Sequence, residues 1–467
     1  MLILCFLAVY FVYLYWYYKH QKKYFMRKGM PGPPSKFLIG NLWDLWFNDQ
    51  PRSIQLREWS NKYGKVYGMH EGQRKVLVVS DINILEEILI KKFDLFHARM
   101  AEGSHWKRLR QLASCAFTNR AFKQMKHTID ESARLMLDAI AERSSEGDEI
   151  NMLEYYQEFT LDVISKVALG QKDFKMFANP NMEMCKQVFN GKANLYMSVL
   201  PALFPSLSGP MLAFCESVAK MAGVGPQVDI EKAVAKRKHE RANGHRSTTD
   251  FIDMFLDAEV EESEMDFGQN AISGRKLHIE EVYSLCVVML LAGFETTANS
   301  LALVTHFLAN HPDVQEKLIE EIDAVCPDDI IEYEALADLT YTECVMKESL
   351  RHYPLASFLV TRTCMKSVDI CGFTFEEGDM IQTDPWSMHM NKEVWGEDTE
   401  EFRPERWLHP NPRGRIAFQA FGEGPRMCLG VRFALLEEKL ALVHLLKKYR
   451  VERSEHTVSG MERISKQ

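Results

Sequence analysis

The sequence lacks the marks of several common classes of protein. None of its 10 cysteines stands in a C-x-x-C pair, and no group of cysteine and histidine residues has zinc-finger spacing. The formal net charge is -9, so the basic excess expected of a nucleic-acid partner is missing. Internal repeats and low-complexity segments are missing as well. These absences disfavour zinc-finger, nucleic-acid-binding and repeat proteins.

The composition indicates one large globular body. A length of 467 residues would suggest two or three domains of about 100–200 residues each, but no linker divides the chain. Hydrophobic residues make up 46% and charged residues 26%, which is ordinary globular usage. We expect the cysteines to be reduced and mostly buried, which suits a protein that faces the cytosol.

The N-terminal segment predicts a membrane anchor. Residues 1–18 are apolar or aromatic, with tyrosine and tryptophan at the C-terminal end, and a basic stretch runs from Lys19 to Lys28. The alternative is a cleaved signal peptide, but a basic n-region and a small-residue cleavage site are missing. We expect a transmembrane anchor over 1–18, a basic and proline-rich linker over 19–34, and the main domain over 35–467 on the cytosolic side.

The remaining pattern predicts a mainly α fold with a small, mostly antiparallel β portion (α+β). Strand-like residues run from Lys65 to Ser80, and short β-rich pieces from Thr361 to Met390. Helical spacing occurs over Asp250–Asp257, over Ile279–Leu308, which is the longest periodic run, and from about Val431 to Tyr449. Pro312 is placed to begin a helix.

The most informative motif is the segment from Phe421 to Gly430. Gly422 and Gly424 permit a tight turn, and Cys428 stands just before a predicted helix. The N–H groups of that helix end would lower the pKa of the thiol, and Gly430 would let the backbone approach a flat cofactor. Arg426 supplies a cation for a cofactor carboxylate.

This segment resembles the haem-ligand signature of the cytochrome P-450 family, and the resemblance extends from end to end of the chain. It implies a P-450 fold, haem b (iron protoporphyrin IX) as cofactor and Cys428 as the axial ligand of its iron. A thiolate in that position favours O–O cleavage. The resemblance also implies that Trp106, Arg110, Arg362, Arg426 and Phe421 contact the haem. The alternative for each basic residue alone is a solvated surface.

A second motif, Ala292–Thr297, lies within the longest predicted helix. The Thr296 hydroxyl is expected to bond back to the carbonyl of Ala292 and to open a polar notch, while Glu295 is a carboxylate in apolar surroundings. The resemblance implies that Glu295 and Thr296 deliver protons to activated oxygen. The alternative is a kinked core helix with a salt-bridged glutamate.

Three further residues are expected to be structural. Glu348 and Arg351 lie on one helical face, and the resemblance implies that Arg406 joins them in a buried ionic cluster. Trp407 follows where the family more often has phenylalanine. Five basic residues are predicted to form a docking face for an acidic redox partner, namely Lys107, Arg108, Lys439, Lys447 and Lys448.

The chain departs from the family pattern in two places. Only six residues separate Arg99 from Trp106, where members usually carry a longer loop and helix that wall the substrate pocket. The usual C-terminal β-hairpin is expected to be absent or replaced, because the sequence stops at Gln467. An alternatively spliced product would have these features.

The sequence therefore predicts a monooxygenase of the endoplasmic reticulum membrane, similar to animal microsomal members. It would insert one oxygen atom from O2 into a lipophilic substrate such as a sterol, fatty acid or xenobiotic. Electrons would come from NADPH through a separate NADPH-cytochrome reductase, with cytochrome b5 as a further donor, because the chain has no flavin or nucleotide fingerprint. The alternatives are a haem-thiolate isomerase or dehydratase and a catalytically impaired haem-binding protein.

Overall fold

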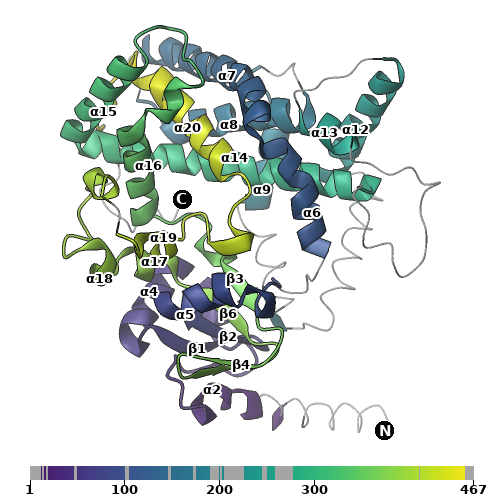
Figure 1. Cartoon of the computed structure of the whole chain (residues 1–467), viewed down its shortest axis with the longest axis vertical. Helices are drawn as coiled ribbons and strands as arrows, with labels where there is room; N and C mark the ends of the chain where they lie inside the picture. Colours follow the sequence, from purple (N-terminus) through teal and green to yellow (C-terminus); the bar gives the residue numbers. More distant parts are fainter. Residues whose placement is uncertain are drawn as a thin grey trace.

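The structure is a computed structural model, and it describes residues 12, 15–16, 19–46, 50–99, 105–145, 149–171, 175–189, 199, 202–203, 226–244, 250–257, 277–409 and 411–457. These residues form a large helical part and a smaller part built on β-strands, which carries the N-terminal segment (Figure 1). The mainly α fold with a small β portion is confirmed.

The β portion comprises one sheet of four strands and one of two. In the larger sheet the order is β1-β2-β6-β3, with β2 parallel to β6 and the other two pairs antiparallel. The smaller sheet pairs β4 with β5 antiparallel. The strand bounds are β1 Val66–Glu71, β2 Arg74–Val79, β3 Thr361–Thr363, β4 Val368–Ile370, β5 Phe373–Phe375 and β6 Met380–Thr383.

Short helices surround the sheets, and apolar residues of both pack into a second core. Their bounds are α2 Tyr24–Arg27, α3 Leu42–Trp46, α4 Arg52–Tyr63, α5 Ile82–Glu86, η1 Glu87–Lys91, η2 Phe93–Leu95, η7 Ser357–Leu359, α17 Pro385–His389, α18 Lys392–Trp395, η8 Pro404–Trp407, α19 Gly414–Ala417 and η9 Gly424–Arg426. The predicted β-rich stretch from Thr361 to Met390 is thus only partly β, since Asp384 caps α17 through a bond from the Ser387 N–H.

The helical part is built around one main hydrophobic core. Its helices are α6 His105–Ala113, η3 Ser114–Phe117, α7 Asn119–Ser145, α8 Met152–Leu169, α9 Asn181–Phe189, α12 Pro226–Ala242, α13 Phe251–Leu256, α14 Ile279–Asn310, α15 Pro312–Val325, η6 Ala335–Ala337, α16 Thr340–His352 and α20 Val431–Leu446.

Helix α14 is the central element of the helical part. It packs most extensively along α8 and also contacts α12, α16 and α20 (Figure 1). The contact with α8 is close at Gly293, where an added Cβ would lie 2.8 Å from Cδ1 of Ile164. A side chain at this position would push the two helices apart, which explains why a poor helix former is tolerated there.

The predicted anchor over 1–18 lies largely outside the described residues. Within the described part of the chain, α14 is the one helix whose length and composition would allow it to cross a membrane, and it is a packed core helix. The segments on which the two departures were predicted, Met100 to Ser104 and the residues after Thr457, also lie outside the described residues.

Candidate functional site

The cysteine loop is a closed turn fixed by its glycines. Gly422 and Gly424 have φ of +71° and +75°, in the left-handed region that glycine adopts without strain. A Cβ on Gly424 would lie 2.1 Å from the carbonyl oxygen of Leu89, so the loop is pressed against η1. The Cys428 N–H donates to the Phe421 carbonyl at 2.8 Å and closes the turn. The predicted turn is therefore confirmed.

The thiol of Cys428 lies at the start of α20, as predicted. The N–H groups of Gly430 and Val431 act to lower its pKa, and so do the charges of Arg110 and Arg99. Burial by the surrounding protein nevertheless outweighs them and raises the pKa of the thiol. The helix end thus acts on the thiol in the predicted direction, and burial is the larger effect.

Buried arginines gather beside this loop. Arg362, on β3, has no exposed surface, and its guanidinium donates to the carbonyls of Thr361 at 2.7 Å and Glu423 at 3.4 Å. Burial, followed by the charges of Arg99 and Arg426, lowers its pKa to about 9. Its Nε has no hydrogen-bond partner in the described part of the chain.

The aromatic and basic residues of α6 complete the cluster. The guanidinium of Arg426 lies 3.7 Å from the centre of the Trp106 ring, and its Nε donates to the carbonyl of His97 at 3.0 Å. The guanidinium of Arg110 lies 5.9 Å from the centre of the same ring. Burial lowers the pKa of Arg110, and the charge of Cys428 acts to raise it. Four of the predicted cofactor contacts, Trp106, Arg110, Arg362 and Arg426, therefore meet near Cys428.

This arrangement fits an anionic cofactor that carries a metal ion. Neighbouring buried cations repel one another, and the groups that shift the pKa of Arg362 include no carboxylate. An external anion with oxygen acceptors would relieve both the repulsion and the unpaired Nε. Haem supplies such groups as propionates, and its iron accepts a thiolate. Phe421 contributes its carbonyl to the loop, and contact of its ring with haem stays a prediction.

Helix α14 presents one accessible face in the middle of the protein. Val288, Ala292 and Thr296 follow one another at intervals of four residues, and all three are exposed. The Thr296 hydroxyl donates to the carbonyl of Ala292 at 2.6 Å, as predicted. Helix α14 continues to Asn310, so this bond does not end the helix.

The carboxylate of Glu295 is held by amides. Asn299 Nδ2 donates to its Oε1 at 3.0 Å, and Gln157 Nε2, from α8, donates to its Oε2 at 3.3 Å. No ion pair joins Glu295 to a cation within the described residues, so the alternative of a salt-bridged glutamate is not supported. Thr296 and Glu295 are bonded to different groups here, and their joint role in proton delivery stays a prediction.

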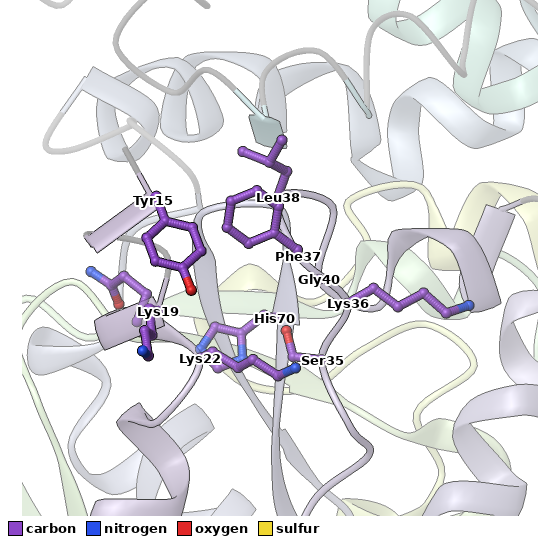
Figure 2. A pocket seen from close by; sticks show the side chains of 11 residues that line it. Tyr15, Lys19, Lys22, Ser35, Lys36, Phe37, Leu38, Gly40 and His70 are labelled. Atoms are coloured by element: carbon purple, nitrogen blue, oxygen red, sulfur yellow. The ribbon is translucent and has the colours of Figure 1, made fainter. Parts of the chain in front are cut away.

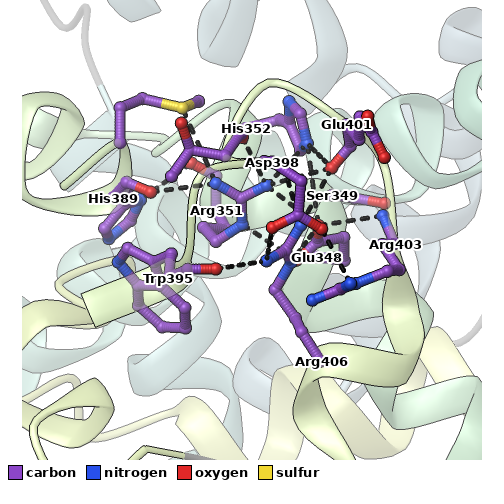
Figure 3. Close-up of polar contacts among 12 residues, drawn as sticks. Glu348, Ser349, Arg351, His352, His389, Trp395, Asp398, Glu401, Arg403 and Arg406 are labelled. Carbon is purple, nitrogen blue, oxygen red and sulfur yellow. Dashed lines mark hydrogen bonds and ion pairs between the residues drawn. The ribbon is translucent and has the colours of Figure 1, made fainter. Parts of the chain in front are cut away.

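The structural cluster joins Glu348 to Arg351 and Arg406 (Figure 3), and Glu348 and Arg351 have no exposed surface. Arg351 donates to both oxygens of Glu348 at 2.9 Å, and Arg406 Nε donates to Oε1 at 2.8 Å. Burial alone would raise the pKa of Glu348, but bonds from His352 and Arg351 and the charge of Arg406 hold it well below its usual range. The three residues meet as predicted.

The predicted basic docking face is wrong in part. Lys439 is buried, and its amine donates to the carbonyl of Leu336 and to Glu343, each at 3.0 Å. Arg108 is paired with Glu281, whereas Lys107 and Lys448 are exposed. A lysine on a helix is usually exposed, so the sequence predicted that Lys439 faces solvent, but in the structure it donates to two acceptors in the interior.

Sequence reasoning missed three participants. Arg99 joins the cluster because Ala98 pairs with Thr363, which brings the next residue beside Arg362. Gln157 reaches Glu295 from another helix, and no local motif announces it. Trp407 donates its indole N–H to Glu348 Oε2 at 2.9 Å, whereas the sequence registered only a mild change.

Comparison with known proteins gives a consistent result. The model of the Cytochrome P450 family matches residues 30–463. The cytochrome P450 CYP13A10 of Caenorhabditis elegans is 36% identical over 93% of this chain and 91% of its own length. CYP13A1 and CYP13A2 of the same organism are 36% and 38% identical, over 98% and 94% of this chain and 95% and 91% of their own lengths. The alignment with CYP13A1 spans 492 positions, more than the 467 residues here, so that relative has segments which this chain lacks.

Proposed function

The chain belongs to the cytochrome P450 family and is a haem-thiolate monooxygenase, and from this premise we propose that Cys428 ligates the iron of haem b and that the substrate is a lipophilic small molecule. One observation carries the assignment of the site. The thiol of Cys428 lies within the electrostatic reach of Arg110 and Arg99, and Arg99 acts in turn on the buried Arg362, which donates to two carbonyls and has no carboxylate among the groups that shift its pKa.

In this proposal each residue of the cluster around Cys428 has its own role. Haem bound through a thiolate supplies the chemistry that cleaves the O–O bond. Arg110, Arg362 and Arg426 bind its propionates through charge-assisted hydrogen bonds, and Trp106 stacks on Arg426 to fix the direction of that guanidinium. The cluster thereby holds the cofactor in one orientation.

The accessible face of α14 supports the oxygen chemistry and the choice of a lipophilic substrate. Thr296 holds a proton at its hydroxyl, which donates to Ala292 at present and is free to rotate toward a new acceptor. Glu295 exchanges protons with it and is kept in place by Asn299 and Gln157. Val288 on the same face is 55% exposed and offers an apolar surface to the substrate.

The proposal includes a place in the cell and a source of electrons. Residues 1–18 would anchor the chain in the endoplasmic reticulum membrane, residues 19–34 would form the linker, and residues 35–467 would form the cytosolic domain. The apolar anchor sequence and the basic residues after it support this arrangement. A membrane-bound NADPH-cytochrome reductase would deliver electrons, with cytochrome b5 as an additional donor.

The absorption spectrum of the reduced carbon monoxide complex tests the ligand. We expect a long-wavelength Soret band for the full chain, and its loss in Cys428→Ala. Cys371→Ala is the matched control, because Cys371 is an exposed thiol in the turn between β4 and β5. A band that persists in Cys428→Ala would show that another side chain ligates the iron.

Turnover separates the monooxygenase from the two alternatives. With the reductase and a range of lipophilic compounds, we expect substrate-dependent consumption of NADPH and O2 and a product that contains one atom of labelled oxygen. Conversion of a peroxide without NADPH would indicate an isomerase or dehydratase. A normal carbon monoxide spectrum with neither activity would indicate an impaired protein.

A further inference from the structure

A pocket of about 190 Å³ lies between the N-terminal segment and the first turn of the main domain (Figure 2), and no residue of the cysteine loop lines it. Its lining comes from three sources, namely the segment that precedes α2, the residues just after the Pro31–Pro34 stretch, and His70 and Gly72 at the end of β1. We call it the linker pocket. Nothing in the oxygenase chemistry above uses it.

One side of the linker pocket is polar and cationic. Lys19 and Lys22 are exposed, and neither forms an ion pair with another described residue. Lys36 is paired with Asp44 at 2.6 Å. Lys22 extends beside the hydroxyl of Ser35, and His70 lies next to both (Figure 2). The pocket therefore has a net positive charge.

His70 gives the pocket a polar floor. The residue is only 5% exposed, and its Nε2 has no hydrogen-bond partner among the described residues. The Phe25 ring packs against it at 5.0 Å between centroids, and Gly40 approaches so closely that a Cβ there would lie 2.2 Å from the His70 carbonyl oxygen. Burial lowers the pKa of His70 to about 4, and its ring donates to the backbone of Gln21, so Nε2 is an acceptor that a donor group of a ligand or water would satisfy.

The other side of the linker pocket is apolar. The Tyr15 and Phe37 rings lie 5.8 Å apart, and Leu38 extends beside them (Figure 2). Phe37 and Leu38 are 50% and 40% exposed. Leu38 has φ of +66°, a conformation that bulky residues rarely adopt. An exposed leucine held in a strained turn indicates a surface that meets something other than water.

We propose that the linker pocket binds an anionic phospholipid, with the lipid phosphate at Lys19 and Lys22 and the acyl chain along Phe37 and Leu38. The inference rests on the membrane attachment proposed above. The pocket joins a phosphate-binding side to an apolar side directly after the predicted anchor, at the depth where headgroups lie. The lipid would fix the angle between the anchor and the main domain.

The effect of each lysine has an expected size. One lysine close to an anionic surface strengthens binding by about fivefold, the equivalent of about 1 kcal/mol. Lys22→Gln should therefore raise the half-saturating fraction of anionic lipid by about fivefold. Leu38→Asn should weaken the binding of any acyl chain, and asparagine tolerates the left-handed φ. Lys448→Gln is the matched control, because Lys448 is an exposed lysine just after α20.

The test uses the full haem-loaded chain with vesicles of phosphatidylcholine that contain a rising fraction of phosphatidylserine. A phosphatidylserine carrying a photoreactive group in its acyl chain labels the protein, and mass spectrometry maps the labelled peptides. We expect saturable labelling of the peptide that contains Phe37 and Leu38, weakened in Lys22→Gln and unchanged in Lys448→Gln. Equal labelling by the phosphatidylcholine analogue would overturn the proposal, and so would no effect of Lys22→Gln.

Flotation of the vesicles separates this inference from the membrane attachment itself. A chain that floats with pure phosphatidylcholine but shows no preference for phosphatidylserine retains the anchor and refutes the lipid site. A chain that floats only with phosphatidylserine supports the lipid site and refutes the anchor, and one that floats with neither refutes both. Inorganic phosphate that protects Lys22 from amine labelling without lipid, and that abolishes the lipid labelling, would assign the pocket to a soluble phosphate instead.

Discussion

Replacement of Trp407 by phenylalanine removes one donor from the buried cluster and leaves most of the ring. Glu348 Oε2 accepts from two donors, the indole of Trp407 and Nε of Arg351, each at 2.9 Å. Because the acceptor is a charged group with no exposed surface, loss of one bond should cost about 1.5–3 kcal/mol. The lost part of the indole also leaves Trp395 and Phe418 with less contact, which adds a smaller cost.

Thermal unfolding of the haem-loaded protein measures this loss. For a chain of 467 residues the entropy of unfolding is roughly 1 kcal/mol per degree, so Tm should fall by roughly 2–3 °C. Scan rates must match, because large proteins often unfold irreversibly. Trp43→Phe is the control, since Trp43 is 51% exposed, and its Tm should change by less than roughly 1 °C.

A double variant identifies the bond responsible. In a Glu348→Gln background the indole no longer faces a charged acceptor, so Trp407→Phe should cost less than it does in the wild type. Equal Tm changes for Trp407→Phe and Trp43→Phe, or an unchanged cost in the Glu348→Gln background, would refute the claim that the indole stabilises this carboxylate.

Three other predictions concern separate parts of the structure. Burial lowers the pKa of His389 to about 3, so below the unfolded value of about 6.5 the unfolded chain binds a proton that the folded chain does not. Between pH 7 and pH 5 the free energy of unfolding of the wild type should therefore fall by about 2 kcal/mol more than that of His389→Gln in denaturant titrations. Equal falls in the two proteins would contradict this. Gly424→Ala should destabilise the protein by more than about 3 kcal/mol, because the added Cβ would meet the Leu89 carbonyl. The control Gly378→Ala, at a φ of +85° but with open space around it, should cost only about 1 kcal/mol. Similar costs for the two variants would show that backbone conformation alone matters. Arg362→Met removes a buried cation that has no carboxylate among the groups that shift its pKa. The haem-free protein should therefore keep its Tm, whereas the haem-loaded protein should lose haem to apomyoglobin faster. A large fall in the Tm of the haem-free protein would show that the arginine is structural.

The sequence predicted most regular elements because their signals are local. The strand-like residues from Lys65 to Ser80 form β1 and β2, and helical spacing from Ile279 predicted α14 to within two residues. Pro312 begins α15, as its fixed φ favours. The β prediction from Thr361 to Met390 was wrong at α17, because short strands and one capped turn of helix are bounded by the same polar residues.

The cysteine loop was also a local matter, and the sequence by itself determined it. Two glycines, a cysteine and a following helix specify the turn through φ values and one backbone bond, within ten residues. Which cations surround the thiol was decided only by tertiary structure. Arg99 reaches the cluster through a bridge between Ala98 and Thr363, residues far apart in the chain, and its sequence neighbours give no sign of this.

The presence of a charged side chain in the sequence did not indicate whether that side chain is exposed or buried. Lys439 stands among apolar residues of α20 and was predicted to face solvent, yet it lies against Leu336 and Glu343. The pKa of Cys428 likewise depends on how much protein surrounds the sulfur, which outweighs the helix end that the sequence announces. Backbone turns follow from short-range sterics, whereas burial and electrostatics sum contributions from the whole fold, and only the folded chain sets that sum.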